Sequence, residues 1–166
     1  MRYYKMTDAD GKLTAIGTGS GGVEITLHEW ADKEQKVPFR DLEGIMPGTT
    51  VTKIAEVENT GSADAWIRVK LDKEIIPAED NAEVNPDLVK LDLDTEKWEK
   101  KGDYYYYKEA VAPGETTAPL LKSVAFETKM GNEYQNAKAN VDVLAQAVQV
   151  ANNGKTIWEA KGWPQE

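Results

Sequence analysis

PGTTVTKIAEVENTGSADAWIRVKL, residues 47–71, is the stretch around which the chain is organised. Apolar and polar side chains alternate from Val51 to Glu58, which is the pattern of a half-buried β-strand. The sequence NTGS at 59–62 then supplies residues that favour turns, and a second strand pattern begins at Trp66. The stretch therefore predicts a β-hairpin, with a strand, a turn and a returning strand.

The composition is that of an ordinary globular domain. The chain has 166 residues, of which 40% are hydrophobic and 30% charged, so it can bury a core as a single domain spanning residues 1–166. Cysteine is absent, which excludes disulfides, thiolate zinc sites and cysteine nucleophiles.

The charge balance limits the classes of partner. A net charge of −9 disfavours nucleic acid and anionic membranes, which both require clustered lysine and arginine. Residues 72–103 hold 11 acidic and five basic side chains, which favours a solvated loop surface, with calcium or a basic partner as the alternative. No apolar run approaches the ~18 residues of a membrane helix, so we expect no membrane span. The start, MRYYKMTDADG, indicates either a cytosolic protein or a chain that begins after a removed signal peptide.

The first 22 residues predict a hairpin and a hinge. Residues 2–6 and 12–16 are strand candidates around the polar turn at 7–11. The glycine-rich run at 17–22 predicts a flexible link that lets the hairpin pack away from the body of the domain.

Further strands are predicted along the rest of the chain, at 23–30, 88–93 and 120–126. Trp98 and residues 104–107 flank a Lys-Lys-Gly-Asp turn and predict a hairpin with aromatic arms. The two Pro-Gly pairs, at 47–48 and 113–114, are expected to form equivalent corners of two sheets.

Residues 139–150, ANVDVLAQAVQV, fit both a helical and a strand period, so periodicity leaves the choice open. The strand-rich surroundings favour a strand. At the C-terminus, Thr156 and Glu159 have capping-box spacing and predict one short helix. About ten strands with almost no helix predict an all-β fold, a jelly-roll-like antiparallel β-sandwich with one short C-terminal helix.

No residue set indicates catalysis, and we expect no enzyme, no cofactor and no metal site. His28 is the single histidine, and Asp32 stands where a zinc protease of the H-E-x-x-H kind needs its second histidine. Asp8 and Asp10 begin like a calcium loop, but Gly19 stands where the bidentate glutamate is required. Asp92 and Asp94 form a carboxylate pair without a nucleophile nearby.

Four consecutive tyrosines place Tyr104 and Tyr106 on one face of a strand and Tyr105 and Tyr107 on the other. One pair is expected in the core and the other at the surface. We name Tyr105 and Tyr107 as the candidates for binding a glycan or a protein partner through aromatic contacts.

Several segments in order resemble one known family. They are AIG at 15–17, VEITLHEW at 23–30, VENTG at 57–61, AWIRV at 65–69, GDYYYYK at 102–108, PGETTAPL at 113–120 and AQAVQ at 145–149. Together they are similar to the TasA and camelysin family, exported β-sandwich proteins of Gram-positive bacteria processed by a SipW-type signal peptidase.

The resemblance implies export to the extracellular space or cell surface. It also implies a jelly-roll fold, a strand at 139–149 and a structural role in fibres or biofilm matrix. Partners would be further copies of the chain or related matrix proteins, joined by an N-terminal strand donated to the next subunit. The segment that would be donated contains Arg2, Tyr3, Tyr4, Met6, Leu13 and Ile16.

Two other functions remain as alternatives. One is a monomeric cell-surface module that binds glycan or protein through exposed aromatic side chains. The other is a metalloprotease, the activity described for camelysin, but the chain lacks a recognisable zinc motif.

Overall fold

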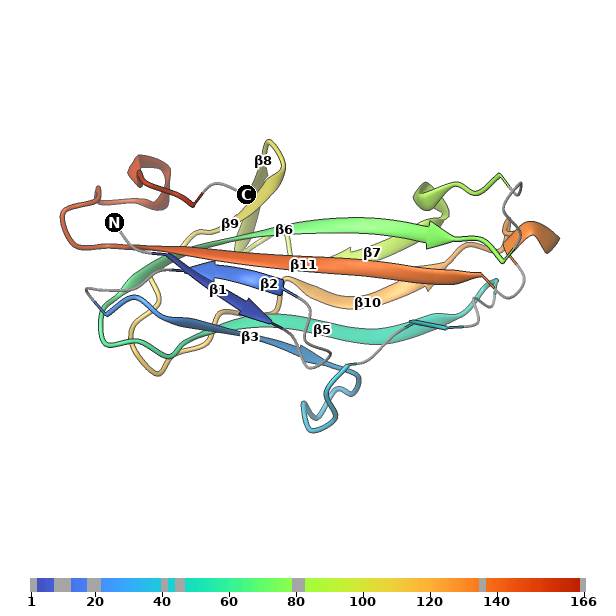
Figure 1. Cartoon of the computed structure of the whole chain (residues 1–166), viewed down its shortest axis with the longest axis horizontal. Helices are drawn as coiled ribbons and strands as arrows, with labels where there is room; N and C mark the ends of the chain where they lie inside the picture. Colours follow the sequence, from blue (N-terminus) through green and yellow to red (C-terminus); the bar gives the residue numbers. More distant parts are fainter. Residues whose placement is uncertain are drawn as a thin grey trace.

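The chain folds into two β-sheets packed face to face (Figure 1). The computed structural model describes residues 3–7, 13–17, 22–39, 42–43, 47–78, 83–134 and 137–164, and for 3–7, 13–17 and 42–43 it describes the backbone alone. Among these residues, seven strands form the larger sheet: β1 (Tyr3–Thr7), β2 (Leu13–Gly17), β11 (Lys138–Gln149), β6 (Ala65–Ile76), β9 (Tyr104–Tyr107) and β8 (Trp98–Lys101) in that order, with β4 (Leu42–Glu43) also on β11. The smaller sheet has the order β3 (Ile25–Trp30), β5 (Thr50–Asn59), β10 (Leu121–Phe126) and β7 (Val89–Leu93).

The connections between strands confirm the predicted jelly-roll-like β-sandwich. Each connection from β5 to β8 crosses from one sheet to the other, and so does each connection from β9 to β11. The described strand pairs are antiparallel, with the exception of β2 and β11, which run parallel. The strand content follows from the alternating patterns, because each strand buries one face against the opposite sheet.

The predicted hairpin at 47–71 is wrong in its pairing, although both of its strands are present. β5 lies in the four-stranded sheet between β3 and β10, whereas β6 lies in the seven-stranded sheet between β11 and β9. Both strands bury apolar side chains on facing surfaces of the two sheets. The turn between them is therefore a corner that joins the sheets.

Asn59 holds this corner through its side chain, which is fully buried. Its amide nitrogen donates to the carbonyl oxygens of Ala63 and Val111, both at 2.8 Å. Its side-chain oxygen accepts a bond from the Gly61 N–H at 2.9 Å. Asparagine suits this position because one small side chain offers two donors and an acceptor to buried backbone groups.

Two glycines let the corner pack tightly against the start of β3. The carbonyl oxygen of Gly22, a residue with φ of 81°, accepts bonds from the N–H groups of Ser62 and Ala63. A Cβ atom at Gly61 would overlap that carbonyl oxygen. Any side chain at Gly61 would therefore push the corner away from β3.

The two Pro-Gly turns lie at opposite ends of β5. Gly48 N–H donates to Phe126 O beside the start of the strand, and Gly114 N–H donates to Asn59 O at its end. Both glycines have positive φ, at 78° and 82°, which is the backbone conformation that glycine adopts without strain. The expected corner role is present at both positions.

The ambiguous segment at 139–150 is a strand, as favoured. β11 pairs residue by residue with β6 from Lys138↔Ile76 to Gln149↔Ala65. The side chains at Ala139, Val141, Val143, Ala145 and Ala147 are all buried in the core, which requires the two-residue period.

The aromatic hairpin of β8 and β9 is also confirmed. Gly102 in its turn has φ of 65°. Trp98 and Tyr107 pack with ring centroids 4.9 Å apart. Both bind the backbone of Ala118: the Trp98 indole N–H donates to the Ala118 carbonyl, and the Ala118 N–H donates to the Tyr107 hydroxyl. The hairpin is thereby attached to the segment before β10.

The predicted C-terminal helix is present as one short 3-10 turn, η3 (Ile157–Glu159). Thr156 stands at its N-cap but makes no side-chain cap bond, and the Glu159 carboxylate accepts from the Lys155 N–H. Two further 3-10 turns that the sequence did not predict are η1 (Pro86–Leu88) and η2 (Asn132–Tyr134).

Replacing Asn59 tests the importance of the corner. We expect Asn59→Ala to lower the free energy of unfolding by about 2–4 kcal/mol, because it leaves buried backbone groups without partners. Urea denaturation followed by tryptophan fluorescence measures the change. Asn140→Ala, at a half-buried position on the outward face of β11, is the control and should stay within about 0.5 kcal/mol. Equal effects of the two substitutions would contradict the role of Asn59.

Candidate functional site

The N-terminal hairpin, the predicted donor segment, is present as β1 and β2. The strands pair antiparallel, with Met6 opposite Ala15 and Thr7 opposite Leu13. Five of the six named donor residues lie in these strands: Tyr3, Tyr4, Met6, Leu13 and Ile16. Arg2 lies outside the described residues.

β2 docks on the edge of β11 within its own chain. The parallel register joins Ala15 to Ala145 and Ile16 to Gln146. On the other side of β11, β6 pairs along all twelve residues of the strand. The hairpin is thus joined to β11 by a far shorter ladder than the one that joins β11 to β6.

The two tyrosines named as partner-binding candidates lie on the inward side of β9, and burial leaves Tyr107 no exposed ring for a partner. Tyr107 is 7% exposed and belongs to the core, where its hydroxyl accepts the Ala118 N–H. Tyr105 is half-buried and packs against the core. The two-residue alternation was predicted correctly. Because Tyr107 is buried between the two sheets, Tyr105 is on the inward side with it, and Tyr104 and Tyr106 are on the outward side.

Arg68 organises the outward face of the larger sheet beside these tyrosines. Its guanidinium lies 3.8 Å from the ring centroid of Tyr104 and 4.6 Å from that of Trp163. Arg68 Nε donates to the Gln146 side chain at 2.7 Å, and Nη1 donates to the Tyr106 hydroxyl at 3.1 Å. A guanidinium is suited to this position because its flat face stacks on rings while its edge donates hydrogen bonds.

The C-terminal segment covers part of this face. Ile157 is buried against Trp66 and Val148, and Trp163 packs beside them. Asn153 secures the segment: its amide nitrogen donates to the carbonyl oxygens of Gln149 and Lys161. The segment returns over the sheet near β8 and β9 (Figure 1).

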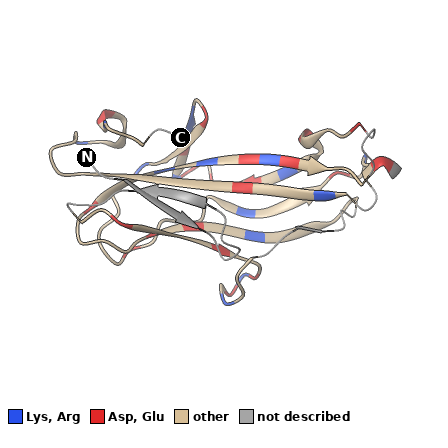
Figure 2. Cartoon of the chain, viewed as in Figure 1, with Lys and Arg blue, Asp and Glu red and all other residues tan. Residues whose placement is uncertain are grey.

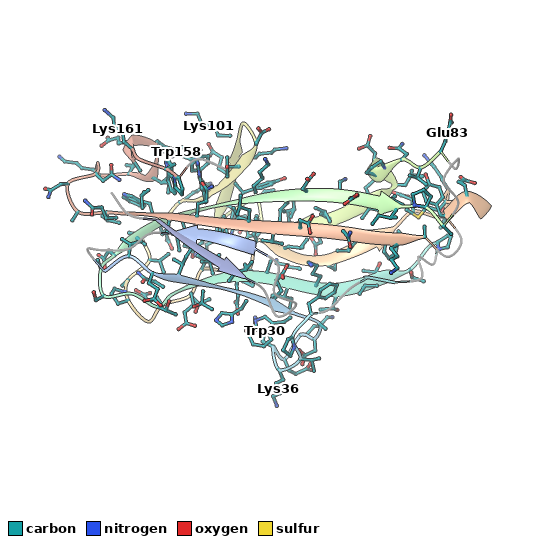
Figure 3. The ribbon with its side chains drawn as sticks, viewed as in Figure 1. Trp30, Lys36, Glu83, Lys101, Trp158 and Lys161 are labelled. Carbon is teal, nitrogen blue, oxygen red and sulfur yellow. The ribbon has the colours of Figure 1, made fainter. Side chains whose placement is uncertain are left out.

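Trp158 is the exposed part of this aromatic cluster. Its side chain is 41% exposed, with its ring centroid 5.3 Å from that of Tyr106. The Lys101 ammonium lies 5.7 Å from the same ring, and both side chains project from the same end of the molecule (Figure 3). We call Tyr104, Tyr106, Trp158 and Trp163 the outer aromatic face. Sequence reasoning missed it because the C-terminal tryptophans join the tyrosines only through folding.

Two buried nitrogen atoms beneath this face have no hydrogen-bond partner among the described residues. They are Trp66 Nε1 and Gln146 Nε2. Both residues are nearly inaccessible, at 4% and 0% exposed. The two residues are diagonal neighbours on adjacent strands: Gln146 of β11 pairs with Arg68, which is two residues after Trp66 on β6.

A charged pair occupies the inner face of the smaller sheet. Lys53 Nζ lies 3.2 Å from a Glu29 carboxylate oxygen, and the two side chains are only 5% and 10% exposed. The Lys53 ammonium also lies 4.0 Å from the centroid of the Phe39 ring. The arrangement stabilises a charge on an otherwise apolar face of β5.

His28 lies on the opposite, outward face of β3. Its Nε2 atom is 2.8 Å from a Glu58 carboxylate oxygen, and its ring stacks on Trp30 with centroids 5.4 Å apart. The Trp30 indole N–H donates to the Glu56 carboxylate. These contacts support the interpretation of His28 as a surface strand residue.

The carboxylates of Asp92 and Asp94 lie in different surroundings. Asp92 is exposed on β7, and Asp94 accepts bonds from the Glu96 and Lys97 N–H groups in the following turn. The Lys97 bond is the main cause that lowers the pKa of Asp94. Its stabilising effect is present above about pH 3.9, the ordinary aspartate pKa, and is lost as pH falls through the lowered value.

Within the described residues, no group of three or more histidine, cysteine, aspartate or glutamate side chains is placed to hold a metal ion. No helix in the described part of the chain has the length and hydropathy to span a membrane. No protein-family profile, curated protein or solved structure matches the chain significantly.

The Lys53–Glu29 pair gives a second stability test. Lys53→Met should cost about 3 kcal/mol of unfolding free energy, because it removes the buried ammonium that lies 3.2 Å from the Glu29 carboxylate. The double variant Lys53→Met/Glu29→Leu should recover most of this loss. Urea denaturation measures both, with Lys33→Met at an exposed position as the control. A full-sized loss in the double variant would show that packing, and not the loss of the Lys53–Glu29 ion pair, causes the effect.

Proposed function

We propose that the chain is a secreted structural subunit of an extracellular fibre or matrix, assembled by exchange of its N-terminal hairpin between copies. The observation that carries this proposal is the docking of the hairpin. β1 and β2 form an antiparallel hairpin whose strand pairing with the domain is the short parallel register on β11. The resemblance to the TasA and camelysin family supports the same role.

Exchange of the hairpin between copies does not depend on contacts that are absent from the single chain. A hairpin from a neighbouring copy would form the same register with Ala145 and Gln146 that the chain's own hairpin forms. The bonds broken and formed are therefore the same, as in domain swapping. Four of the six residues at 17–22 are glycines, which is the composition expected of the link that such an exchange needs.

The rest of the domain would stay intact during exchange. Asn59 and its bonds join the two sheets without any part of the hairpin, and β6 and β11 pair along their full length. A copy that releases its hairpin thus keeps its core, and it gains an open β11 edge that accepts a strand from the next copy.

A cysteine pair tests the exchange directly, because the chain has no native cysteine. Ala15→Cys/Ala145→Cys places thiols at register partners, and neighbouring strands lie about 4.8 Å apart, within disulfide range. Oxidation of assembled fibres should give a covalent ladder on a non-reducing gel. Oxidation of dilute monomer should give an internal crosslink that blocks later assembly.

Two controls accompany this experiment. Ala15→Cys alone should give dimers at most, and deletion of residues 1–19 should abolish fibres in electron micrographs. Fibres that persist after the deletion, or that form without a ladder in the double variant, would show that assembly uses another surface.

The outer aromatic face favours a second function, a monomeric surface module that binds a glycan. Trp158 is 41% exposed, and the ring of Tyr106 lies beside it in a tilted arrangement with the centroids 5.3 Å apart. Flat aromatic side chains flanked by a cation, here Lys101, are suited to contact the apolar face of a sugar ring while binding its hydroxyls.

Trp158→Ala on a glycan array tests this second function. For any glycan that the wild-type chain binds, the affinity of the Trp158→Ala variant should be lower by about tenfold or more, because the main stacking surface is removed. Val37→Ala, which removes another exposed apolar side chain, should leave binding unchanged. Equal binding by both variants would exclude the aromatic face as the glycan site.

A further inference from the structure

A groove opens between the two sheets on the side away from the N-terminal hairpin. It measures about 540 Å³ and is lined by residues of β6, β7, β8 and β9, with η1 contributing as well. β6 forms one side and β7 the other. Tyr105, one of the predicted partner-binding tyrosines, is among its lining residues.

The groove exists because β9 ends its pairing with β6 early and because β7 is at the end of its sheet. β9 pairs with β6 only at Arg68 and Val69, so from Lys70 to Ile76 the described strands pair with one edge of β6 alone, through β11. β7 is the last described strand of its sheet and pairs with β10 alone. Two strand edges therefore border the same groove.

The backbone of β7 points hydrogen-bonding groups into this groove. Leu88 O accepts from Glu127 N, and Asp94 N donates to Leu120 O, so the even-numbered positions bond toward β10. In an antiparallel ladder the alternate residues then face the other way. Leu91 and Leu93 thus direct their N–H and C=O groups to the groove, and Val89 O, in the same phase, accepts from Lys73 Nζ at 2.9 Å.

Apolar and charged side chains line the groove together. Leu71, Leu91, Leu93 and Tyr105 line it, and all four pack partly against the core. Four lysines share the lining with three aspartates, which gives a local balance of +1 in a chain of net charge −9: Lys70, Lys73, Lys90 and Lys100 with Asp72, Asp87 and Asp103. Lysines and acidic residues alternate along β6 in Figure 2.

We infer that this groove binds an extended acidic segment of a partner protein, which adds a strand beside β7. Alternate apolar side chains of that segment would contact Leu91 and Leu93, and its acidic side chains would meet Lys90 and Lys100. The five residues of β7 offer about 17 Å of edge, enough for a strand of five residues. This site is separate from the β11 edge and does not depend on hairpin exchange.

A designed peptide tests the site on the full chain. The probe is a fluorescein-labelled, end-capped peptide of ten residues in which valine and glutamate alternate. Fluorescence anisotropy should show saturable binding, and hydrogen exchange should slow at the amides of Val89, Leu91 and Leu93. A peptide in which valine and lysine alternate, and a valine–glutamate peptide interrupted by two central prolines, should both bind at least tenfold more weakly.

Charge-reversal variants locate the interaction. Lys90→Glu/Lys100→Glu should weaken binding of the glutamate peptide about tenfold. Lys33→Glu/Lys129→Glu makes the same change in net charge at exposed positions outside the groove and should leave affinity within about twofold. All four substituted lysines are exposed, so both variants should fold, and unfolding curves verify that they do.

Four outcomes would overturn the inference. They are no binding up to about 1 mM peptide, equal binding of the lysine peptide, an equal loss in the two charge variants, and protection at β11 in place of β7. Light scattering adds a check for a second copy in the groove. A wild-type dimer that Lys90→Glu/Lys100→Glu dissociates would replace the acidic partner by the chain itself.

Discussion

The buried side chain of Asn59 is the interaction on which the rest of the structure depends. β5 and β6 belong to different sheets, and the chain changes sheet within the few residues between them. Asn59 bonds Ala63 within this crossing and Val111 within the crossing from β9 to β10, so a single amide satisfies backbone groups from two crossings. Since the sheets bury one common core, fixing this corner fixes which faces meet.

The edges of the two sheets then determine what the surface can do. A sandwich leaves the outer edges of its sheets with backbone groups that can pair with another strand. In this chain the N-terminal hairpin takes one such edge, at β11, through a short parallel ladder. The β6 and β7 edges face each other across the groove, beyond the point where β9 stops. The proposed self-assembly and the proposed partner binding thus use different edges and different charges.

Charge also takes on another meaning once the chain is folded. Residues 72–103 are acidic in sum, which indicated a solvated surface or a basic partner. Folding collects three lysines of that segment, Lys73, Lys90 and Lys100, around one groove together with Lys70 from β6. Because an incoming strand meets only the side chains that line the groove, the local balance favours an acidic partner.

The strands themselves could be predicted from sequence, because alternation reports directly which side chains face a core. The pattern at 51–58 and the tyrosine run at 104–107 both lie in strands, as predicted, and the N-terminal hairpin also forms. Turn chemistry likewise predicted the Pro-Gly corners and the Gly102 turn.

Partner choice was decided only by the tertiary structure. The same alternation fits a hairpin or a crossing, and the burial of Asn59 against Val111, 52 residues away, made residues 47–71 a crossing. Residues 138–149 form a strand because β6 offers twelve pairing partners, and the local sequence pattern carries no information about such a distant partner. The phase of Tyr105 and Tyr107, the outer aromatic face and the groove beside β7 all depend on contacts between distant segments. Sequence thus determined which residues form strands, and packing determined which strands meet and which edges stay open.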